Sequence, residues 1–537
     1  MLKMLCRSVM TYLLLLLLAL PVAAQAEQKP IIILHTNDIH CGVAENLGID
    51  RVAQYKKQLL ETTPYVALVD AGDAIQGEPI GRLSRGSSII KLMNAAGYDF
   101  AVPGNHEFDY GMPQFLKLAS QLHCGYYSCN LLAAESLQPV LKPYKMLHFG
   151  AKTVAFIGIT TPETLSSSTP VFFQNKDGKY LYSFCEDVGG EKLYKRVQTI
   201  INEVKAAGAD YVIAVAHLGL HTYYPKWSSE SLIRNTRGLT AVLDGHTHEI
   251  ADCIVTALDG RAVRVLQTGT KLQALGKLTI APDGTIATEL LTDLPAGDIK
   301  IQQVLQREQQ HFTVKLKKPL GKSEVTLYVA DPLSGTRLVR NSETNMGDFL
   351  ADAYKTVLAC DAVMLNGGGM RAQLKSGEIS YEDVFKVFPF GNQSVVISVT
   401  GRQLLEALEM AARKTPAESG AFAQVAGISY VINTGIPSGV VIDERGSFVK
   451  YVGPHRISDV RVNGEPLVMI KQYSIGGNDY SLLKGGDGMT MFKDAPLLKA
   501  SVFNDAELVC VFIREHLGGV IDQRYAKLNG GGRIIIR

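Results

Sequence analysis

Five short apolar segments in the first half of the chain each run into a polar loop. They cover residues 31–34, 65–69, 98–102, 211–216 and 239–243. Apolar runs of about four to eight residues are typical of strands that are covered on both faces. A helix is expected near 50–62, between the first two strands, so the pattern predicts an α/β arrangement. A further strand is expected at 154–159, but its Thr160-Thr-Pro loop offers no obvious ligand and is interpreted as scaffold.

Side chains that can bind metal ions follow each of the five strands. They are Asp38, His40, Asp73, Asn105, His217, His246 and His248. Ligands gather beyond the carboxyl ends of strands in α/β sheets, so we expect these seven to converge. Seven ligands suit two ions that share one carboxylate, for which Asp73 is the candidate. Mixed imidazole, carboxylate and amide ligands favour zinc, manganese or cobalt over calcium or magnesium.

The loop after the third strand, Pro103 to Asp109, is the most specific stretch of the chain. His106 and Asp109 have the spacing of an imidazole that is oriented by a carboxylate. We therefore assign these two residues to catalysis. In the preceding loop, Gly72 permits a close turn, and Asp70 is expected to form a hydrogen bond within the loop.

The second half begins with a helical pattern from about 301 to 318. A helix over 349–358 and a strand over 362–365 follow, and the strand ends in Asn366-Gly-Gly-Gly-Met-Arg371. Three glycines let a ligand approach the backbone, and an arginine adds a fork for an anionic group. This is not a nucleotide-binding P-loop, because no Gly-Lys-Ser/Thr follows. Phe422 and Tyr480 each lie near a glycine-rich turn, where they either stack on a planar base or pack in the core.

Four motifs carry a resemblance to a known family. Thr36-Asn-Asp38-Ile-His40, Gly72-Asp73, Gly104-Asn-His-Glu107 and Gly245-His-Thr-His248 are similar to motifs of the calcineurin-like metallophosphoesterases. The second half resembles the substrate domain of their exported branch, the 5′-nucleotidase and UDP-sugar hydrolase family. The resemblance implies an α/β (α+β) fold with an N-terminal calcineurin-like β-sandwich flanked by helices at 27–300. A linker helix at 301–320 and a C-terminal α/β nucleotide-binding domain at 321–537 would follow.

The same resemblance implies a set of substrate-binding residues. They are Arg340, Asn366, Arg371, Phe422, Tyr480 and Asp487. The arginines and Asn366 would bind polar parts of a nucleotide, Asp487 its ribose hydroxyls, and the two aromatic residues its base. Tyr480 departs from the family pattern, because the family usually places a Phe six residues before the Asp and Tyr480 lies seven before Asp487.

The implied activity is release of phosphate from nucleoside 5′-monophosphates by a hydrolase with two divalent metal ions. Nucleoside 5′-di- and triphosphates and UDP-sugars remain open as further substrates. A 2′,3′-cyclic-nucleotide 2′-phosphodiesterase with 3′-nucleotidase activity is the nearest alternative enzyme, although the motif from Asn366 to Arg371 argues against it. A nucleotide-binding or adhesion protein without turnover is the alternative of another class.

The ends of the chain and its charge bear on location and partners. Residues 1–26 contain Lys3 and Arg7, a Leu-rich core and Ala24-Gln25-Ala26, the pattern of a cleaved secretory signal peptide. We therefore expect an exported, periplasmic or secreted protein without a membrane anchor, as a monomer or simple homodimer. Cleavage would leave equal numbers of basic and acidic residues, so no nucleic acid polymer is expected as partner.

Seven cysteines would remain after cleavage, so at least one thiol is expected to be free. Export permits disulfides. Cys124 and Cys129 are the easiest local pair, although spacing alone does not fix a connectivity. Cys41 follows His40 directly and is a weaker candidate for a metal ligand.

Overall fold

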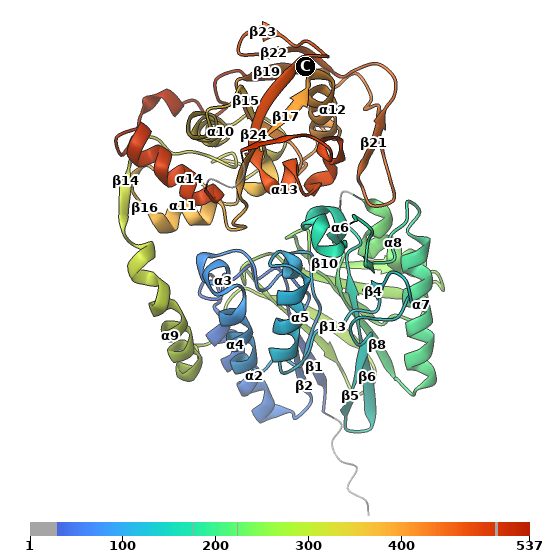
Figure 1. Ribbon diagram of the computed structural model, residues 1–537. Coiled ribbons are helices and arrows are strands. Elements are labelled where there is room, and N and C mark those ends of the chain that lie inside the picture. The colour runs from blue at the N-terminus through green and yellow to red at the C-terminus, as the bar shows by residue number, and fades with distance from the viewer. Residues whose placement is uncertain (1–28, 176, 223, 500–502) are drawn as a thin grey trace, which may run out of the picture.

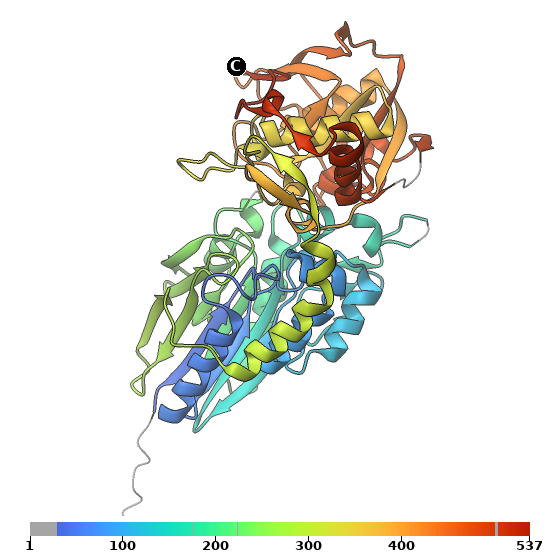
Figure 2. The same ribbon diagram turned by 90° about the vertical axis from the view of Figure 1, so that its left-hand side faces the viewer.

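The computed structural model describes residues 29–175, 177–222, 224–499 and 503–537. The predicted signal peptide lies outside these residues. Figure 1 shows two domains, one above the other, and the helix α9 (Ile299–Leu316) at their side. Figure 2, turned by 90°, shows α9 lying along the N-terminal domain before the chain enters the C-terminal domain.

Two β-sheets form the centre of the N-terminal domain. The first has the strand order β13-β12-β1-β2-β3, with β1 (Ile31–Thr36), β2 (Val66–Asp70), β3 (Phe100–Ala101), β12 (Leu275–Ile280) and β13 (Ile286–Leu291). The second has the order β10-β11-β9-β8-β6-β5, with β5 (Tyr144–Phe149), β6 (Lys152–Thr160), β8 (Tyr211–His217), β9 (Ala241–Leu243), β10 (Ile250–Thr256) and β11 (Ala262–Thr268). The strands β1, β2 and β3 are parallel, as are β6, β8 and β9. The carboxyl ends of the parallel strands within each sheet therefore meet at one edge.

Three apolar cores hold this domain together as a four-layer sandwich. The inward faces of both sheets pack on each other, with Ile33 of β1 and Val215 of β8 among the fully buried residues. The outer face of the first sheet is covered by α2 (Ile49–Thr62), α4 (Ser87–Ala96), α5 (Met112–Gln121) and part of α9. The outer face of the second sheet is covered by α7 (Glu191–Ala206) and α8 (Ser229–Arg234). Every residue of β1 is buried, which explains the continuous apolar run at residues 31–34.

The C-terminal domain is built on a five-stranded sheet. Its order is β18-β15-β24-β17-β25, with β15 (Ala362–Asn366), β17 (Ser394–Thr400), β18 (Ala423–Ala426), β24 (Gln472–Asn478) and β25 (Leu497–Lys499). Residues of this sheet form one apolar core together with α10 (Asn345–Leu358), α11 (Tyr381–Val387) and α14 (Asp505–Val511). They form a second core together with α12 (Gly401–Ala412). Smaller sheets join β14 (Pro319–Ser323) to β16 (Gly377–Ser380) and β26 (Val520–Ile521), and β19 (Ile428–Ile432) to β22 (Ile457–Val462), β23 (Glu465–Pro466) and β27 (Ile534–Ile536).

A hairpin of the C-terminal domain reaches down to the N-terminal domain. It consists of β20 (Val440–Ile442) and β21 (Phe448–Tyr451), and Figure 1 shows it approaching α6 (Thr164–Ser167). At its tip, Arg445 Nη2 lies 3.1 Å from Glu186 Oε1 of the N-terminal domain. The two domains are therefore joined by side-chain contacts as well as by α9.

The predicted α/β architecture with an N-terminal β-sandwich flanked by helices is observed, whereas the domain boundaries stay predictions. All seven cysteines within the described residues have free thiols, so Cys124 and Cys129 form no disulfide here. Cys41 is buried with its thiol against the Ala74 carbonyl. No helix in the described part of the chain has the length and apolar character needed to cross a membrane.

Candidate active site

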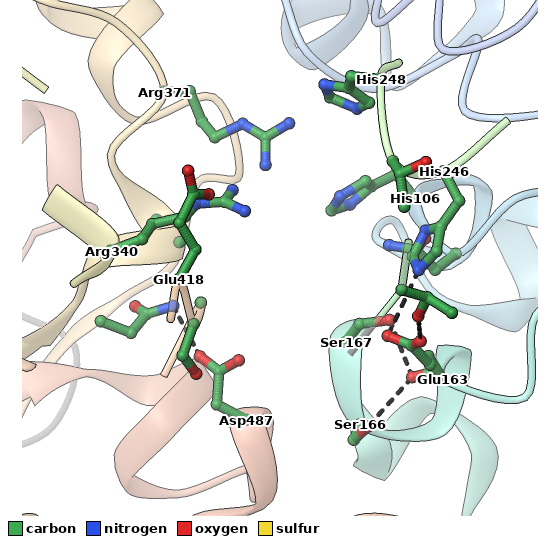
Figure 3. A pocket seen from close by; sticks show the side chains of 18 of the residues that line it. His106, Glu163, Ser166, Ser167, His246, His248, Arg340, Arg371, Glu418 and Asp487 are labelled. Carbon is green, nitrogen blue, oxygen red and sulfur yellow. Dashed lines mark hydrogen bonds and ion pairs between the residues drawn. The ribbon is translucent and has the colours of Figure 1, made fainter. Parts of the chain in front are cut away.

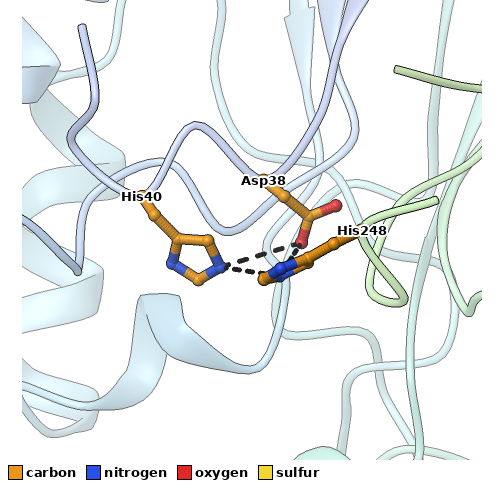
Figure 4. Close-up of side chains that lie close together, drawn as sticks. All are labelled: Asp38, His40 and His248. Carbon is orange, nitrogen blue, oxygen red and sulfur yellow. Dashed lines mark hydrogen bonds and ion pairs between the residues drawn. The ribbon is translucent and has the colours of Figure 1, made fainter. Parts of the chain in front are cut away.

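Two clusters of possible metal ligands lie at the carboxyl ends of the parallel strands. One consists of Asp38, His40 and His248, and the other of Asp38, Asp73 and His217. In the first, the Nε2 atoms of His40 and His248 are 3.1 Å apart, and His248 Nε2 lies 3.4 Å from Asp38 Oδ1 (Figure 4). In the second, His217 Nε2 lies 3.2 Å from Asp73 Oδ2.

Each of the two carboxylates lies close to a histidine of both clusters. His40 Nε2 is 3.9 Å from Asp38 Oδ1 and 3.7 Å from Asp73 Oδ2. His217 Nε2 is also within 4.0 Å of Asp38 Oδ1. The geometry therefore allows either aspartate to be shared by two ions, and the choice of Asp73 stays a prediction.

Unpartnered buried polar atoms point to cations at this place. Asp38 Oδ1, Asn105 Oδ1 and His217 Nε2 have no hydrogen-bond partner, although their residues are at most 2% exposed. Buried polar atoms are normally satisfied, and an ion is one reason for an exception. Divalent cations therefore fit the site.

The second ring nitrogens of two histidines are held by backbone carbonyls. His40 Nδ1 lies 2.9 Å from the Gln76 carbonyl oxygen, and His217 Nδ1 lies 2.7 Å from that of Ala71. Such contacts orient a histidine so that its other nitrogen faces a metal. The backbone is also unusual here: five candidate ligands, Asp38, His40, Asp73, His246 and His248, have positive φ angles. Non-glycine residues in this region cluster at functional sites.

His106 and Asp109 form the pair that their spacing predicted. His106 Nδ1 lies 2.6 Å from Asp109 Oδ2, and the Ser168 hydroxyl donates to Asp109 Oδ1 at 2.8 Å. Burial lowers the pKa of His106, but the charges of Asp109 and Asp73 outweigh burial and raise this pKa overall. The backbone N–H of His106 donates to Asp73 Oδ1 at 2.8 Å, which ties the pair to the ligand clusters.

His246 and Asn105 lie beside these clusters. The rings of His246 and His217 are 5.1 Å apart between centroids. His246 Nε2 lies 3.4 Å from Glu163 Oε2, so its Nδ1 is the nitrogen left for a metal. Asn105 and His246 both line the same pocket as Asp73 and His248.

This pocket lies between the two domains and has a volume of about 360 Å³. Figure 3 shows Arg340, Arg371 and Asp487 of the C-terminal domain on one wall and His106, His246 and His248 on the other. Burial and the neighbouring Arg340 and Arg337 lower the pKa of Arg371. A bound anion would relieve this crowding of positive charge.

On the C-terminal wall of the pocket, the Asn366 side chain forms hydrogen bonds with two neighbouring side chains. Its Nδ2 donates to Asp487 Oδ2 at 2.9 Å, and its Oδ1 accepts from Asn478 Nδ2 at 3.0 Å. Burial raises the pKa of Asp487, and Arg413 opposes this rise. The structure thus brings Arg340, Asn366, Arg371 and Asp487 to one pocket, as their motifs predicted.

Phe422 is a correction to the sequence interpretation. Its side chain is 0% exposed and packs in the core around α12, outside the pocket. It follows Gly420, which does line the pocket, but its own ring turns inward to apolar neighbours. The pocket has another aromatic residue, Phe390, whose ring centroid is 5.4 Å from that of His106.

Tyr480 lies in the pocket wall, and its hydroxyl has several partners. It donates towards the carbonyl oxygens of Ser166 at 3.1 Å and Ser167 at 3.3 Å, in the other domain. It also accepts the Asp487 N–H at 3.1 Å. A phenylalanine could not make these contacts, so the departure from the family pattern links the two domains.

Sequence reasoning missed three residues of the site. Phe390 lies next to Gly391 in Phe388-Pro-Phe390-Gly391, the same aromatic-glycine signal that suggested Phe422. Glu163 and Ser168 belong to the loop after β6, which carried no recognisable motif. The expected hydrogen bonds of Asp70 are present: it accepts from Gly72 N at 3.0 Å and from Thr36 Oγ1 at 2.7 Å.

Both halves of the chain match known protein families. Residues 31–249 match the family described as calcineurin-like phosphoesterase, and residues 319–494 match the 5′-nucleotidase C-terminal domain. The 5′-nucleotidase of Bos taurus is 26% identical over 539 residues, which cover 90% of this chain and 88% of that protein. The trifunctional nucleotide phosphoesterase protein YfkN of Bacillus subtilis is 28% identical over 510 residues, 86% of this chain. The match spans only 32% of the length of that protein.

Solved structures show the same fold. The 5′-nucleotidase precursor of Thermus thermophilus superposes with a TM-score of 0.78 at 24% identity, covering 94% of this chain and 99% of that one. The sulfate thiohydrolase SoxB has a TM-score of 0.70 at 16% identity, covering 94% and 96%. The fold and the site thus define a calcineurin-like metallophosphoesterase. More narrowly, the C-terminal domain and the full-length relatives show that the chain belongs to the 5′-nucleotidase family.

Proposed function

We propose that the protein is a metal-dependent 5′-nucleotidase that releases phosphate from nucleoside 5′-monophosphates. One observation carries this proposal: a single pocket joins the metal-ligand clusters and His106 to Arg371, Asn366 and Asp487 of the C-terminal domain. Relatives named 5′-nucleotidase align over most of the chain, which supports the same assignment. By contrast, the likeness to a sulfate thiohydrolase supports the fold only.

Divalent metal ions belong to this class of enzyme, and the residues present fit them. We propose two ions, zinc, manganese or cobalt, held by the seven predicted ligands: Asp38, His40, Asp73, Asn105, His217, His246 and His248. When bound, such ions polarise phosphoryl oxygens and lower the pKa of a water molecule. The protein's part is to hold the ligands in fixed directions, as the carbonyl contacts of His40 and His217 do.

His106 is proposed to stabilise charge that develops on the phosphoryl group or the leaving oxygen. Its Nδ1 is engaged by Asp109, so Nε2 is the nitrogen available to substrate. A proton on Nε2 could then be donated to the oxygen that leaves with the nucleoside. Asp109 keeps the ring in this orientation.

The C-terminal wall is proposed to read the nucleotide. Arg371 and Arg340 would bind anionic and polar groups near the phosphate, and Asn366 would contact the nucleoside. Asp487, whose Oδ2 already accepts from Asn366, would accept from ribose hydroxyls. Phe390 and Tyr480, the aromatic residues on this wall, would contact the base in place of the Phe422 and Tyr480 pair.

The activity test is phosphate release from a panel of substrates. We expect AMP to be hydrolysed well, and 3′-AMP and 2′,3′-cyclic AMP poorly, because Asn366 and Arg371 form the substrate motif of 5′-nucleotidases. ADP and UDP-glucose would show how far the pocket accepts larger phosphate groups. Efficient cleavage of cyclic AMP without cleavage of AMP would instead favour the cyclic phosphodiesterase, and no turnover with any metal would favour a binding protein.

Export is part of the proposal. The pattern of residues 1–26 supports it, and the similar protein of Thermus thermophilus is likewise described as a 5′-nucleotidase precursor. Comparing the N-terminal residue of the protein from the periplasm or medium with that of the cytoplasmic form tests it. Cleavage after Ala26 is the expected result.

A further inference from the structure

A short segment of the N-terminal domain touches three functional parts of the site. This segment, Thr161–Thr169, contains α6 and is called the α6 segment. Its Glu163 lies against His246 (Figure 3). Its Ser168 donates to Asp109, and its carbonyls at 166 and 167 accept from Tyr480. Neither Glu163 nor Ser168 belongs to the ligand clusters or to the substrate wall, and sequence patterns indicated only scaffold here.

The α6 segment is itself held firmly. Thr164 Oγ1 donates to the Thr161 carbonyl at 2.7 Å, and Ser167 Oγ donates to that of Glu163 at 2.8 Å. Its residues Thr161 and Thr164 are 0% exposed. A buried segment with internal hydrogen bonds can fix the direction of the side chains that it presents.

We propose that Glu163 and Ser168 are positioning residues: Glu163 fixes His246 as a metal ligand, and Ser168 fixes Asp109 and, through it, His106. This inference rests on the proposed function, since it assigns His246 to the metal site and His106 to turnover. Neither residue needs to contact the substrate to act in this way.

The geometry of Glu163 suits this role. Glu163 is only 4% exposed. Its Oε1 accepts a hydrogen bond from the Thr222 hydroxyl, and its Oε2 lies 3.4 Å from His246 Nε2. A carboxylate at that distance selects the tautomer with the proton on Nε2. The lone pair is then on Nδ1, the nitrogen left to bind a cation. Without the carboxylate, the imidazole could change tautomer or rotate.

Ser168 acts on a different pair of residues. It is 1% exposed, and its hydroxyl occupies the Asp109 oxygen that His106 does not use. With both oxygens engaged, the Asp109 carboxylate cannot turn about its Cβ–Cγ bond without losing a hydrogen bond. The Asp109 carboxylate that orients the His106 ring is therefore fixed in turn by Ser168.

The first test measures binding of Zn²⁺ alone to the metal-free protein by titration calorimetry. Glu163→Ala should lower the affinity for one of the two ions about 10- to 100-fold, the usual effect of losing a side chain that orients a metal ligand. Glu163→Gln should stay within a few-fold of the wild type, because an amide oxygen can accept the same hydrogen bond. Wild-type affinity in Glu163→Ala would overturn the proposal.

A matched control and a double variant separate positioning from general damage. Glu409 is another fully buried glutamate beside a histidine, with Oε1 3.0 Å from His455 Nδ1, but it lies outside the pocket. Glu409→Gln should leave Zn²⁺ affinity unchanged. In a His246→Ala background, Glu163→Ala should add no further loss, and an additive loss would show that Glu163 does not act through His246.

The second test concerns Ser168. Ser168→Ala should lower kcat for AMP about 10-fold while KM and Zn²⁺ affinity stay unchanged, and the effect should disappear in an Asp109→Ala background. Loss of metal, or an equal loss in both backgrounds, would overturn this part. If the wild type released no phosphate from AMP, the proposed function would fail, yet the Zn²⁺ titrations would still decide the role of Glu163.

Discussion

Arg82 of the N-terminal domain reaches across the domain boundary to Asp505 of the C-terminal domain. Its Nη1 lies 4.0 Å from Asp505 Oδ1 and donates to the Phe388 carbonyl oxygen at 3.0 Å. The guanidinium also lies over the Phe385 ring, 4.6 Å from its centroid. Two residues after Phe388 comes Phe390, which lines the pocket, so this contact connects domain docking to the substrate wall.

The first prediction is a pH dependence of stability due to Asp505. Burial raises its pKa to about 7, and Arg82 opposes this rise. A carboxyl with a folded pKa above its unfolded value stabilises the fold fully below pH ~4, and this contribution is lost as pH rises towards 7. In the wild type, the free energy of unfolding should therefore fall by up to about 4 kcal/mol between these pH values. In Asp505→Asn this fall should be absent. Denaturant titrations at several pH values measure it.

Other charged or titratable groups near Asp505 are Asp479, Tyr354 and Arg82. Arg82→Ala removes the only cation among them and should move the loss of stability to higher pH. An unchanged pH profile in both the Asp505→Asn and Arg82→Ala variants would contradict the assignment.

The second prediction separates metal ligands from the residue that acts on substrate. Asp73→Ala should lose both ions or nearly so, because Asp73 lies within reach of both His40 and His217. His106→Ala should keep both ions and lose turnover. Elemental analysis of the purified variants decides this, and a metal-free His106→Ala protein would make His106 a ligand instead.

The third prediction uses two phenylalanines of the C-terminal domain. Phe390→Ala should raise KM for AMP while barely changing hydrolysis of a phosphate ester without a base. Stacking on an aromatic ring is worth about 1–3 kcal/mol per base, so the rise in KM should be about 5- to 150-fold. Phe422→Ala should instead destabilise the fold by about 3–5 kcal/mol, because it empties a fully buried site. The reverse result would restore the interpretation drawn from sequence.

The fourth prediction concerns the hairpin tip. Arg445 pairs with Glu186, which is 4% exposed on its side chain, and lies over the Tyr180 ring. Arg445→Ala should remove the ion pair of Glu186 Oε1 and loosen the docking of the domains. We expect kcat/KM for AMP to fall about 3- to 10-fold, or about 1 kcal/mol, with metal content unchanged. Lys450→Ala, an exposed position on the same hairpin, is the control and should have no effect.

Much of the metal centre could be predicted from the sequence. Continuous apolar runs such as Ile31–Leu34 arise because parallel strands are buried on both faces, and such strands bring their carboxyl ends to one edge. Asp38, Asp73 and His217 could therefore be assigned to one site from the sequence alone. Arg371 was found because three glycines before it mark close approach to a ligand, and Asp487 was found through the resemblance to the 5′-nucleotidase family.

Tertiary structure alone decided the rest. Whether Phe422 or Phe390 faces the pocket depends on how the wall packs on α12, and both lie in similar local sequence. Glu163 and Ser168 gain their partners His246 and Asp109 from segments tens of residues away in the chain, so no local spacing reveals them. Periodicity and motifs determine which strands end in ligands because those signals are local. Contacts across layers and domains have no local signal, and only the folded chain sets them.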